Sequence, residues 1–246
     1  MTQHTTPPKA RPTQDRGPRR QVHVAGVEDR DPQRQIHIAG VERWQRVARR
    51  IRVPLGFLTA VVYLVEVVRR APHPTAIAWS FLLVLPGLAL RALASGTVKK
   101  NQELTVTGPY AYTRNPLYLG STLIAAGFAV ALLSWPLALL LAVGFAAIYI
   151  PVIASEEQFL RAAFPQFDIY CHSVPRFIPR LTPARLPRES DSPAVSQPVT
   201  KAATGGFSFA LYLKHREYNS ALGAALLYLS LLYLRPVLEI LVHRAW

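Results

Sequence analysis

Cysteine and methionine are almost absent from the 246 residues, which contain one of each. The single Cys171 excludes an intrachain disulfide framework and a cysteine-rich zinc or iron–sulfur site. Acidic residues are also scarce, because 14 Asp and Glu face 28 Lys and Arg, a net charge of +14. Such an excess suggests a nucleic-acid partner when it covers a whole domain. Here the charges avoid long parts of the chain, so we expect a membrane surface and no nucleic acid.

The longest run without Asp, Glu, Lys or Arg extends over 41 residues, from Asn115 to Ser155. One membrane-spanning helix needs roughly 20 apolar residues, so this run can hold two spans. We therefore predict an all-α, polytopic membrane protein with about five transmembrane helices rather than a soluble domain. The predicted spans are Val53–Val68, Thr75–Ser95, Leu117–Leu133, Pro136–Ala154 and Asn219–Leu234.

Prolines mark irregularities and ends within these spans. Pro86 predicts a kink in the second span, and Ser134-Trp135-Pro136 predicts the hairpin turn between the third and fourth. Arg235-Pro236 predicts the end of the last span. The sequence leaves open whether residues 237–242 complete that span or lie at the membrane interface.

The first 52 residues are predicted to form a disordered basic arm, with 12 Lys and Arg against 5 Asp and Glu and few large apolar residues. Inside the arm, the nine residues from Arg20 return at Arg34 with only Val/Ile exchanges, a period of 14. This duplicate is interpreted as part of a disordered tail or as a docking motif for a partner. Residues 182–206 are predicted to be a Pro/Ser-rich linker, and residues 207–246 a C-terminal transmembrane segment.

Lys and Arg in short flanking segments set the orientation of membrane proteins. If every span crosses, the basic arm, Lys99, Lys100 and Arg114 fall on one side, which we predict to be cytoplasmic. Arg69-Arg70 falls on the opposite side, against the rule. We expect a multi-pass protein of a bacterial inner membrane.

Two polar segments flank the uncharged hairpin and are predicted to meet at one end of it. Gly108-Pro109 predicts a turn, and Arg114-Asn115-Pro116 predicts a loop entering a helix with proline in its first turn. Tyr118 would lie one turn further on the same side. Glu156-Glu157 is interpreted as the first turn of a new helix, where acidic residues complement the dipole, or as part of a site. Together these groups predict an aromatic, mixed-charge pocket for a zwitterionic ligand.

The order of these motifs resembles the isoprenylcysteine carboxyl methyltransferase and phospholipid N-methyltransferase superfamily of integral-membrane enzymes. The shared pattern is a Gly-Pro-Tyr turn, an Arg-x-Pro-x-Tyr motif, a helical hairpin, Glu-Glu, and a tail ending in Val-Pro-x-x-Ile-Pro. The resemblance covers residues 104–179. Residues 53–181 are therefore interpreted as a transmembrane methyltransferase-like core.

The resemblance implies an S-adenosyl-L-methionine-dependent methyltransferase with a cytosolic cofactor pocket. Its acceptor would be a lipid or an isoprenylated or lipidated molecule within the bilayer, modified by carboxylate O-methylation or lipid amine N-methylation. No metal is expected. Carried over by position, the catalytic residues would be Arg114, Glu156 and Glu157, and the cofactor-binding residues would be Gly108, Tyr110, Arg114, Asn115, Pro116, Tyr118, Glu156 and Glu157.

Two positions depart from the family pattern. Asn115 stands where the family has histidine, and an amide can donate a hydrogen bond but cannot take a proton near neutral pH. Ser173 precedes Val174 where members that methylate a prenylcysteine tend to have a basic residue. An amine, a hydroxyl or another lipid acid therefore stays open as the acceptor. The alternatives in other classes are a nicotinamide-dependent membrane reductase of related fold and a non-catalytic membrane scaffold.

Several other polar residues lie near predicted spans. The cluster from Lys214 to Asn219 is interpreted as an interfacial flank or as part of a lipid entrance. Glu66, Arg91 and Arg235 are functional candidates or side chains that reach toward water from the span ends. Cys171 is interpreted as a bystander.

Overall fold

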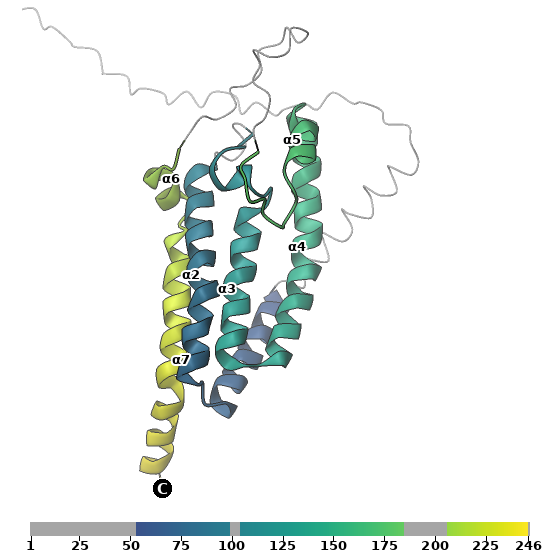
Figure 1. Ribbon diagram of the computed structural model, residues 1–246. Coiled ribbons are helices and arrows are strands. Elements are labelled where there is room, and N and C mark those ends of the chain that lie inside the picture. The colour runs from purple at the N-terminus through teal and green to yellow at the C-terminus, as the bar shows by residue number, and fades with distance from the viewer. Residues whose placement is uncertain (1–52, 99–103, 185–205, 246) are drawn as a thin grey trace, which may run out of the picture.

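The computed structural model describes residues 53–98, 104–184 and 206–245 (Figure 1). Every regular element among them is helical, which confirms the all-α prediction. The predicted arm, its repeat and most of the predicted linker lie outside the described residues. The helices are residues 53–69, α2 (Pro74–Thr97), the short 3₁₀ helix η1 (Gly108–Ala111), α3 (Pro116–Leu132), α4 (Trp135–Ala163), α5 (Phe167–Ser173), α6 (Phe209–Lys214) and α7 (Tyr218–Ala245).

The long helices form a membrane bundle. By length and composition α2, α4 and α7 can each cross a membrane, and α3 is a shorter apolar helix. All five predicted spans are helical, and the protein is a polytopic membrane protein. Figure 1 shows η1, α5 and α6 at one end of the bundle, which we call the polar end. The opposite, hairpin end carries the α3–α4 turn and the C-terminus.

The prediction that the last span ends at Arg235-Pro236 was wrong, because α7 continues through Pro236 to Ala245. Pro86 likewise lies inside α2. A proline removes one backbone hydrogen bond, whereas ending the helix leaves four carbonyls without helical partners. In apolar surroundings each unpaired group costs several kcal/mol, so continuing the helix is the less costly arrangement. The apolar run 237–242 therefore belongs to α7.

Glycine lets the middle of α2 and the second turn of α3 approach closely. A methyl group added at Gly87 would lie 2.8 Å from the carbonyl oxygen of Gly120, and one added at Gly120 would lie 2.7 Å from Cγ of Arg91. Larger side chains would push the two helices apart. This contact fixes α3, which carries candidate site residues in its first turns, against α2.

A glutamate–arginine pair fastens the hairpin end. Arg70 Nε lies 2.5 Å from Glu66 Oε2, and Arg70 Nη1 donates to the carbonyl of Leu133 at 2.9 Å. Leu133 has a left-handed backbone (φ 49°), and the Ser134 hydroxyl caps α4 by accepting from Leu137 N at 3.3 Å. Arg70, which the orientation rule places on the wrong side, thus has partners within the protein.

Two tyrosines attach α7 to the other helices. The Tyr63 hydroxyl lies 2.8 Å from the Ser230 hydroxyl, and it donates to the carbonyl of Leu227 at 3.0 Å. On the neighbouring face the Tyr228 hydroxyl lies 2.7 Å from the Ser80 hydroxyl of α2. These bonds pair hydroxyls that would otherwise be unpaired in an apolar environment.

Candidate active site

The first motif forms a tight turn that leads into α3. Gly108 has φ +59°, a left-handed conformation that glycine adopts without steric cost, and it opens the 3₁₀ helix η1. Pro116 occupies the first turn of α3, as predicted, where its missing N–H costs nothing. Tyr110 lies in η1, Arg114 lies between η1 and α3, and Tyr118 lies in the first turn of α3.

The Val-Pro-x-x-Ile-Pro tail runs alongside this turn. Arg114 N donates to the carbonyl of Pro175 at 2.9 Å, and Arg180 N donates to the carbonyl of Tyr112 at 2.9 Å. The amide of the buried Asn115 donates to the carbonyl of Arg176 at 2.9 Å. Asn115 therefore acts here as a hydrogen-bond donor that holds the tail, a role that needs no proton acceptor.

Glu156 and Glu157 lie inside α4, so the interpretation that they open a new helix was wrong. A helix needs roughly 20 apolar residues to cross a membrane. The helix that begins at Trp135 continues beyond that length to Ala163, and Glu156 and Glu157 lie in this continuation. The two carboxylates therefore stand on successive positions of one rigid helix and point to different surroundings. Glu157 is buried and Glu156 is exposed.

Glu157 is the centre of an ion-pair cluster. Arg176 Nε donates to Oε1 at 3.0 Å and Arg176 Nη2 donates to Oε2 at 2.5 Å, a bidentate pairing. Arg114 Nη1 lies 3.2 Å from Oε1 of the same carboxylate. The Glu157 carboxylate raises the pKa of the Arg176 guanidinium above its ordinary value. The cluster joins α4, the entry to α3 and the tail.

The exposed Glu156 pairs with the other helix of the hairpin. The Tyr118 hydroxyl donates to Glu156 Oε1 at 3.0 Å. The Tyr118 ring lies 4.7 Å from the ring of Tyr149, centroid to centroid, in a tilted arrangement. This carboxylate and its phenol remain open to a ligand at the surface of the polar end.

Tyr110 is partly buried in the same region. Its backbone carbonyl accepts the hydroxyl of Tyr170 at 2.8 Å. Burial and the nearby carboxylates of Glu156 and Glu217 raise the pKa of the Tyr110 phenol. Burial likewise raises the pKa of Tyr170. Both phenols therefore stay neutral at physiological pH and can donate hydrogen bonds.

Cys171, interpreted from the sequence as a bystander, contacts a predicted site residue. Arg114 Nη1 donates to Cys171 Sγ at 2.8 Å. Arg114 Nε is buried and has no hydrogen-bond partner among the described residues. A buried guanidinium with an unused donor is suited to an anionic group of a ligand.

The structure brings the predicted residues of the two segments together, with the exposed Gly108 and the buried Pro116 shaping the backbone between them. It adds Arg176, which pairs with Glu157, and brings Glu217 within electrostatic range of Tyr110; the sequence assigned neither residue a role in the pocket. A buried carboxylate on an apolar helix requires a cation, which is the signal that could have pointed to Arg176. No comparable signal exists for Glu217.

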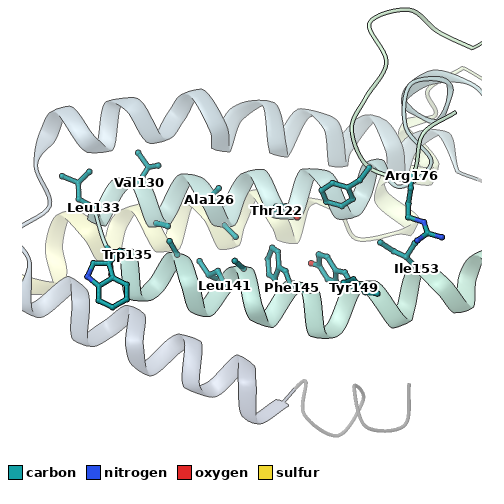
Figure 2. Close-up of a pocket in the computed structure, with 18 residues that line it drawn as sticks. Thr122, Ala126, Val130, Leu133, Trp135, Leu141, Phe145, Tyr149, Ile153 and Arg176 are labelled. Atoms are coloured by element: carbon teal, nitrogen blue, oxygen red, sulfur yellow. The ribbon is translucent and has the colours of Figure 1, made fainter. Parts of the chain in front are cut away.

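A groove of about 900 Å³ runs between α3 and α4 toward this cluster. Figure 2 shows Leu133 and Trp135 at its hairpin end and Tyr149, Ile153 and Arg176 at its polar end. Small side chains such as Ala126 leave the space open along the middle. The groove is apolar along its length and carries a half-exposed guanidinium where it reaches the cluster.

The residues present fit S-adenosyl-L-methionine. Its carboxylate matches the unused donor of Arg114, its ammonium and ribose hydroxyls match an exposed carboxylate such as Glu156, and its adenine matches the tyrosine rings. Among the described residues, no group of three His, Cys, Asp or Glu side chains is arranged to hold a metal ion.

Comparison with known proteins finds the methyltransferase family that the sequence motifs resemble. Two curated relatives match over 84 residues: the nickel-cobalt-cadmium resistance protein NccN of Alcaligenes xylosoxydans xylosoxydans at 42% identity, and the cobalt-zinc-cadmium resistance protein CzcN of Cupriavidus metallidurans at 39%. Each alignment covers 34% of this chain and 39% of the relative. No solved structure matches the chain. Residues 86–166 match the phospholipid methyltransferase family, within the superfamily of integral-membrane methyltransferases that the motifs resemble.

Proposed function

We propose that the protein is an S-adenosyl-L-methionine-dependent methyltransferase of a bacterial inner membrane, acting on a lipid or lipidated acceptor from the cytoplasmic side. One observation carries the proposal. The apolar α3–α4 groove ends at Arg176, which is paired with Glu157 next to the exposed Glu156 on α4. An acceptor with an apolar chain in the groove would present its polar group there.

The cofactor would supply an electrophilic methyl group on a sulfonium. Arg114 would bind its carboxylate through Nε, which has no protein partner among the described residues. Glu156 would accept from its ammonium or hydroxyl groups, and Tyr118 would donate to a hydroxyl oxygen. Glu157 keeps Arg114 and Arg176 in place and is not expected to touch the acceptor.

The protein itself would position the acceptor and, for an ammonium acceptor, remove its proton. Methyl transfer is an in-line displacement, so alignment of the acceptor atom with the methyl group supplies much of the rate. The acceptor atom forms a bond to the methyl carbon while the carbon–sulfur bond breaks. An ionised carboxylate acceptor needs no base, whereas an ammonium acceptor must first lose a proton, which the exposed Glu156 would take.

Methyl transfer is tested directly with purified protein in nanodiscs made from bacterial lipids. We expect tritium from methyl-labelled cofactor to enter the extracted lipids, and mass spectrometry to show a 14-dalton gain, roughly the mass of one CH₂ unit. Titration with S-adenosylhomocysteine and with NADPH separates the classes. Binding of NADPH alone would support the reductase alternative, and binding of neither would support a scaffold.

The groove is tested separately from the cofactor site. Ala126→Trp fills the middle of the groove, so we expect it to raise KM for the lipid at least about tenfold with S-adenosylhomocysteine affinity unchanged. Leu139→Trp, on the exposed lipid-facing side of α4, is the matched control and should behave as wild type. Equal KM values in the two variants would contradict the groove assignment.

The relatives' names favour a second candidate function, a contribution to metal resistance. We propose that the methylated product contributes to resistance against cobalt, nickel or cadmium, rather than that this chain binds the metal. Deletion of the gene should lower the tolerated metal concentration, and the Glu157→Gln variant should fail to restore it. Full restoration by that variant would separate the resistance from methyl transfer.

A further inference from the structure

The C-terminal unit, residues 206–245 with α6 and α7, lies outside the family match but packs beside the candidate site. It holds the last turn of α2, where Ser208 N donates to the carbonyl of Gly96 at 2.8 Å and His215 Nδ1 lies 2.8 Å from the carbonyl of Ser95. The turn at Gly108 rests on the same end of α2, at Thr97. The C-terminal unit and η1 therefore share one support.

An ion pair joins the start of α7 to α2. Arg91 Nε lies 2.5 Å from Glu217 Oε1, and the Ser220 hydroxyl donates to the same oxygen at 2.7 Å. The Glu217 side chain is only 10% exposed and that of Arg91 23%. Because the pair is largely buried, removing one partner leaves the other as an uncompensated charge in apolar surroundings. The position of each side chain therefore depends on the other.

Arg91 also contacts the first two turns of α3. Its Nη1 donates to the hydroxyl of Ser121 and lies 3.5 Å from the carbonyl of Leu117, while its Cγ lies over Gly120. These residues belong to the same two turns of α3 as Tyr118, which bonds Glu156. A shift of Arg91 would therefore move the helix turn that presents Tyr118.

We propose that Arg91 and Glu217 are positioning residues of the methyl-transfer site, so that the C-terminal unit is a working part of the enzyme rather than an added anchor. This inference rests on the proposed function. Glu217 acts through Arg91 on the first turns of α3 and thereby on the distance between Tyr118 and Glu156. Displacements of about 1 Å in such an arrangement can cost about a hundredfold in rate.

The electrostatics of Tyr110 supports this arrangement. The carboxylates of Glu156, from α4, and Glu217, from the C-terminal unit, both raise the pKa of its phenol beyond the effect of burial. Tyr110 is therefore within electrostatic range of both acidic groups. Glu217 belongs to the same electrostatic environment as the residues predicted from the motifs.

The experiment compares wild type, Glu217→Gln, Arg91→Gln, the double variant and Glu217→Asp in lipid nanodiscs. Glu239→Gln is the matched control, because Glu239 forms an exposed ion pair with Arg235 on the same helix. We expect each single variant to lower kcat at least about tenfold while KM for the lipid changes less than about twofold. The double variant should lose no more than the singles, because the pair acts as one unit. Glu217→Asp should retain more activity than Glu217→Gln.

The outcomes separate this inference from the proposed function. If wild type binds no S-adenosylhomocysteine and transfers no methyl group, the proposed function fails. If wild type is active and Glu217→Gln matches it, or if the losses of the two single variants add in the double variant, the positioning role is contradicted. Should Glu217→Gln prove unstable, Ser220→Ala removes the second donor to the same oxygen, and we expect a loss of about threefold.

Discussion

Both ends of the bundle bury a glutamate against an arginine, but the two pairs connect different parts of the chain. At the hairpin end, Glu66 and Arg70 are neighbours on one helix, four residues apart, and Arg70 adds a bond to the carbonyl of Leu133. At the polar end, Glu157 of α4 binds Arg176 from the tail and Arg114 from the entry to α3.

This difference distinguishes a structural ion pair at the hairpin end from a candidate ligand site at the polar end. The hairpin-end pair closes a turn, and its buried Glu66 Oε2 has Arg70 Nε as ion-pair partner but no hydrogen bond among the described residues. The polar-end cluster gathers three segments and lies beside an exposed carboxylate, Glu156, and a buried donor without a partner, Arg114 Nε. Perturbed and incompletely paired groups of this kind gather at functional sites.

The sharpest test of this comparison replaces the glutamate at the polar end. Glu157→Gln leaves Arg114 and Arg176 without a counter-charge, so we expect S-adenosylhomocysteine affinity to fall at least about a hundredfold. Because Arg176 is half exposed, the loss in unfolding free energy should be only about 2 kcal/mol. Isothermal titration in detergent and a thermal melt measure the two effects. Glu66→Gln serves as the control and should leave the affinity unchanged.

Glu156→Gln tests the exposed carboxylate. It removes the proposed proton acceptor and keeps a group that can bond Tyr118, so we expect kcat to fall about a hundredfold for an amine acceptor. The rate for an acceptor that is already ionised should change much less. Steady-state rates with an amine lipid and a fatty-acid lipid make the distinction. Equal losses for both acceptors would limit Glu156 to its proposed part in cofactor binding and exclude a part in proton transfer.

At the hairpin end, Arg70→Leu should affect stability alone. It removes the bond to Leu133 and the ion pair with Glu66, so we expect the unfolding free energy to fall by about 1–3 kcal/mol. Methyl-transfer rates below the melting transition should equal those of wild type. A large change in rate with unchanged stability would mean that this end of the bundle takes part in the reaction.

The smallest effect concerns the partly buried phenol of Tyr110. Burial and two carboxylates raise its pKa above the ordinary value of 10.0, so the folded state holds the proton more tightly than the unfolded state. The resulting stability is complete below about pH 10 and declines as the pH rises above it. Tyr110→Phe should therefore flatten the decline in melting temperature between pH 10 and 11.5, roughly 1.5 pH units of titration. An identical decline in the variant would contradict the account.

Local chemistry made part of this structure predictable. The uncharged run predicts the two helices of the hairpin. Pro116 predicts the start of α3, and Gly108 predicts the turn before it. The meeting of Tyr118 with Glu156 also follows from the sequence, because two antiparallel helices bring their flanking segments to one end.

Contacts that depend on tertiary packing could not be predicted in this way. The pairing of Glu157 with Arg176 requires the tail to fold back along residues 111–115, which no periodicity signals. The approach of Glu217 to Arg91 depends on how α7 docks on α2, across residues for which composition gives only a linker. The continuation of α7 through Pro236 reflects the cost of unpaired backbone in an apolar environment, which outweighs local propensity.

The central claim is that the two segments flanking the hairpin together bind an adenosyl sulfonium nucleotide. Titration of purified wild type, Arg114→Ala and Glu66→Gln with S-adenosylhomocysteine tests it most directly. We predict binding to wild type and Glu66→Gln with equal affinity, and none to Arg114→Ala. Wild-type affinity in a folded Arg114→Ala variant would contradict the account.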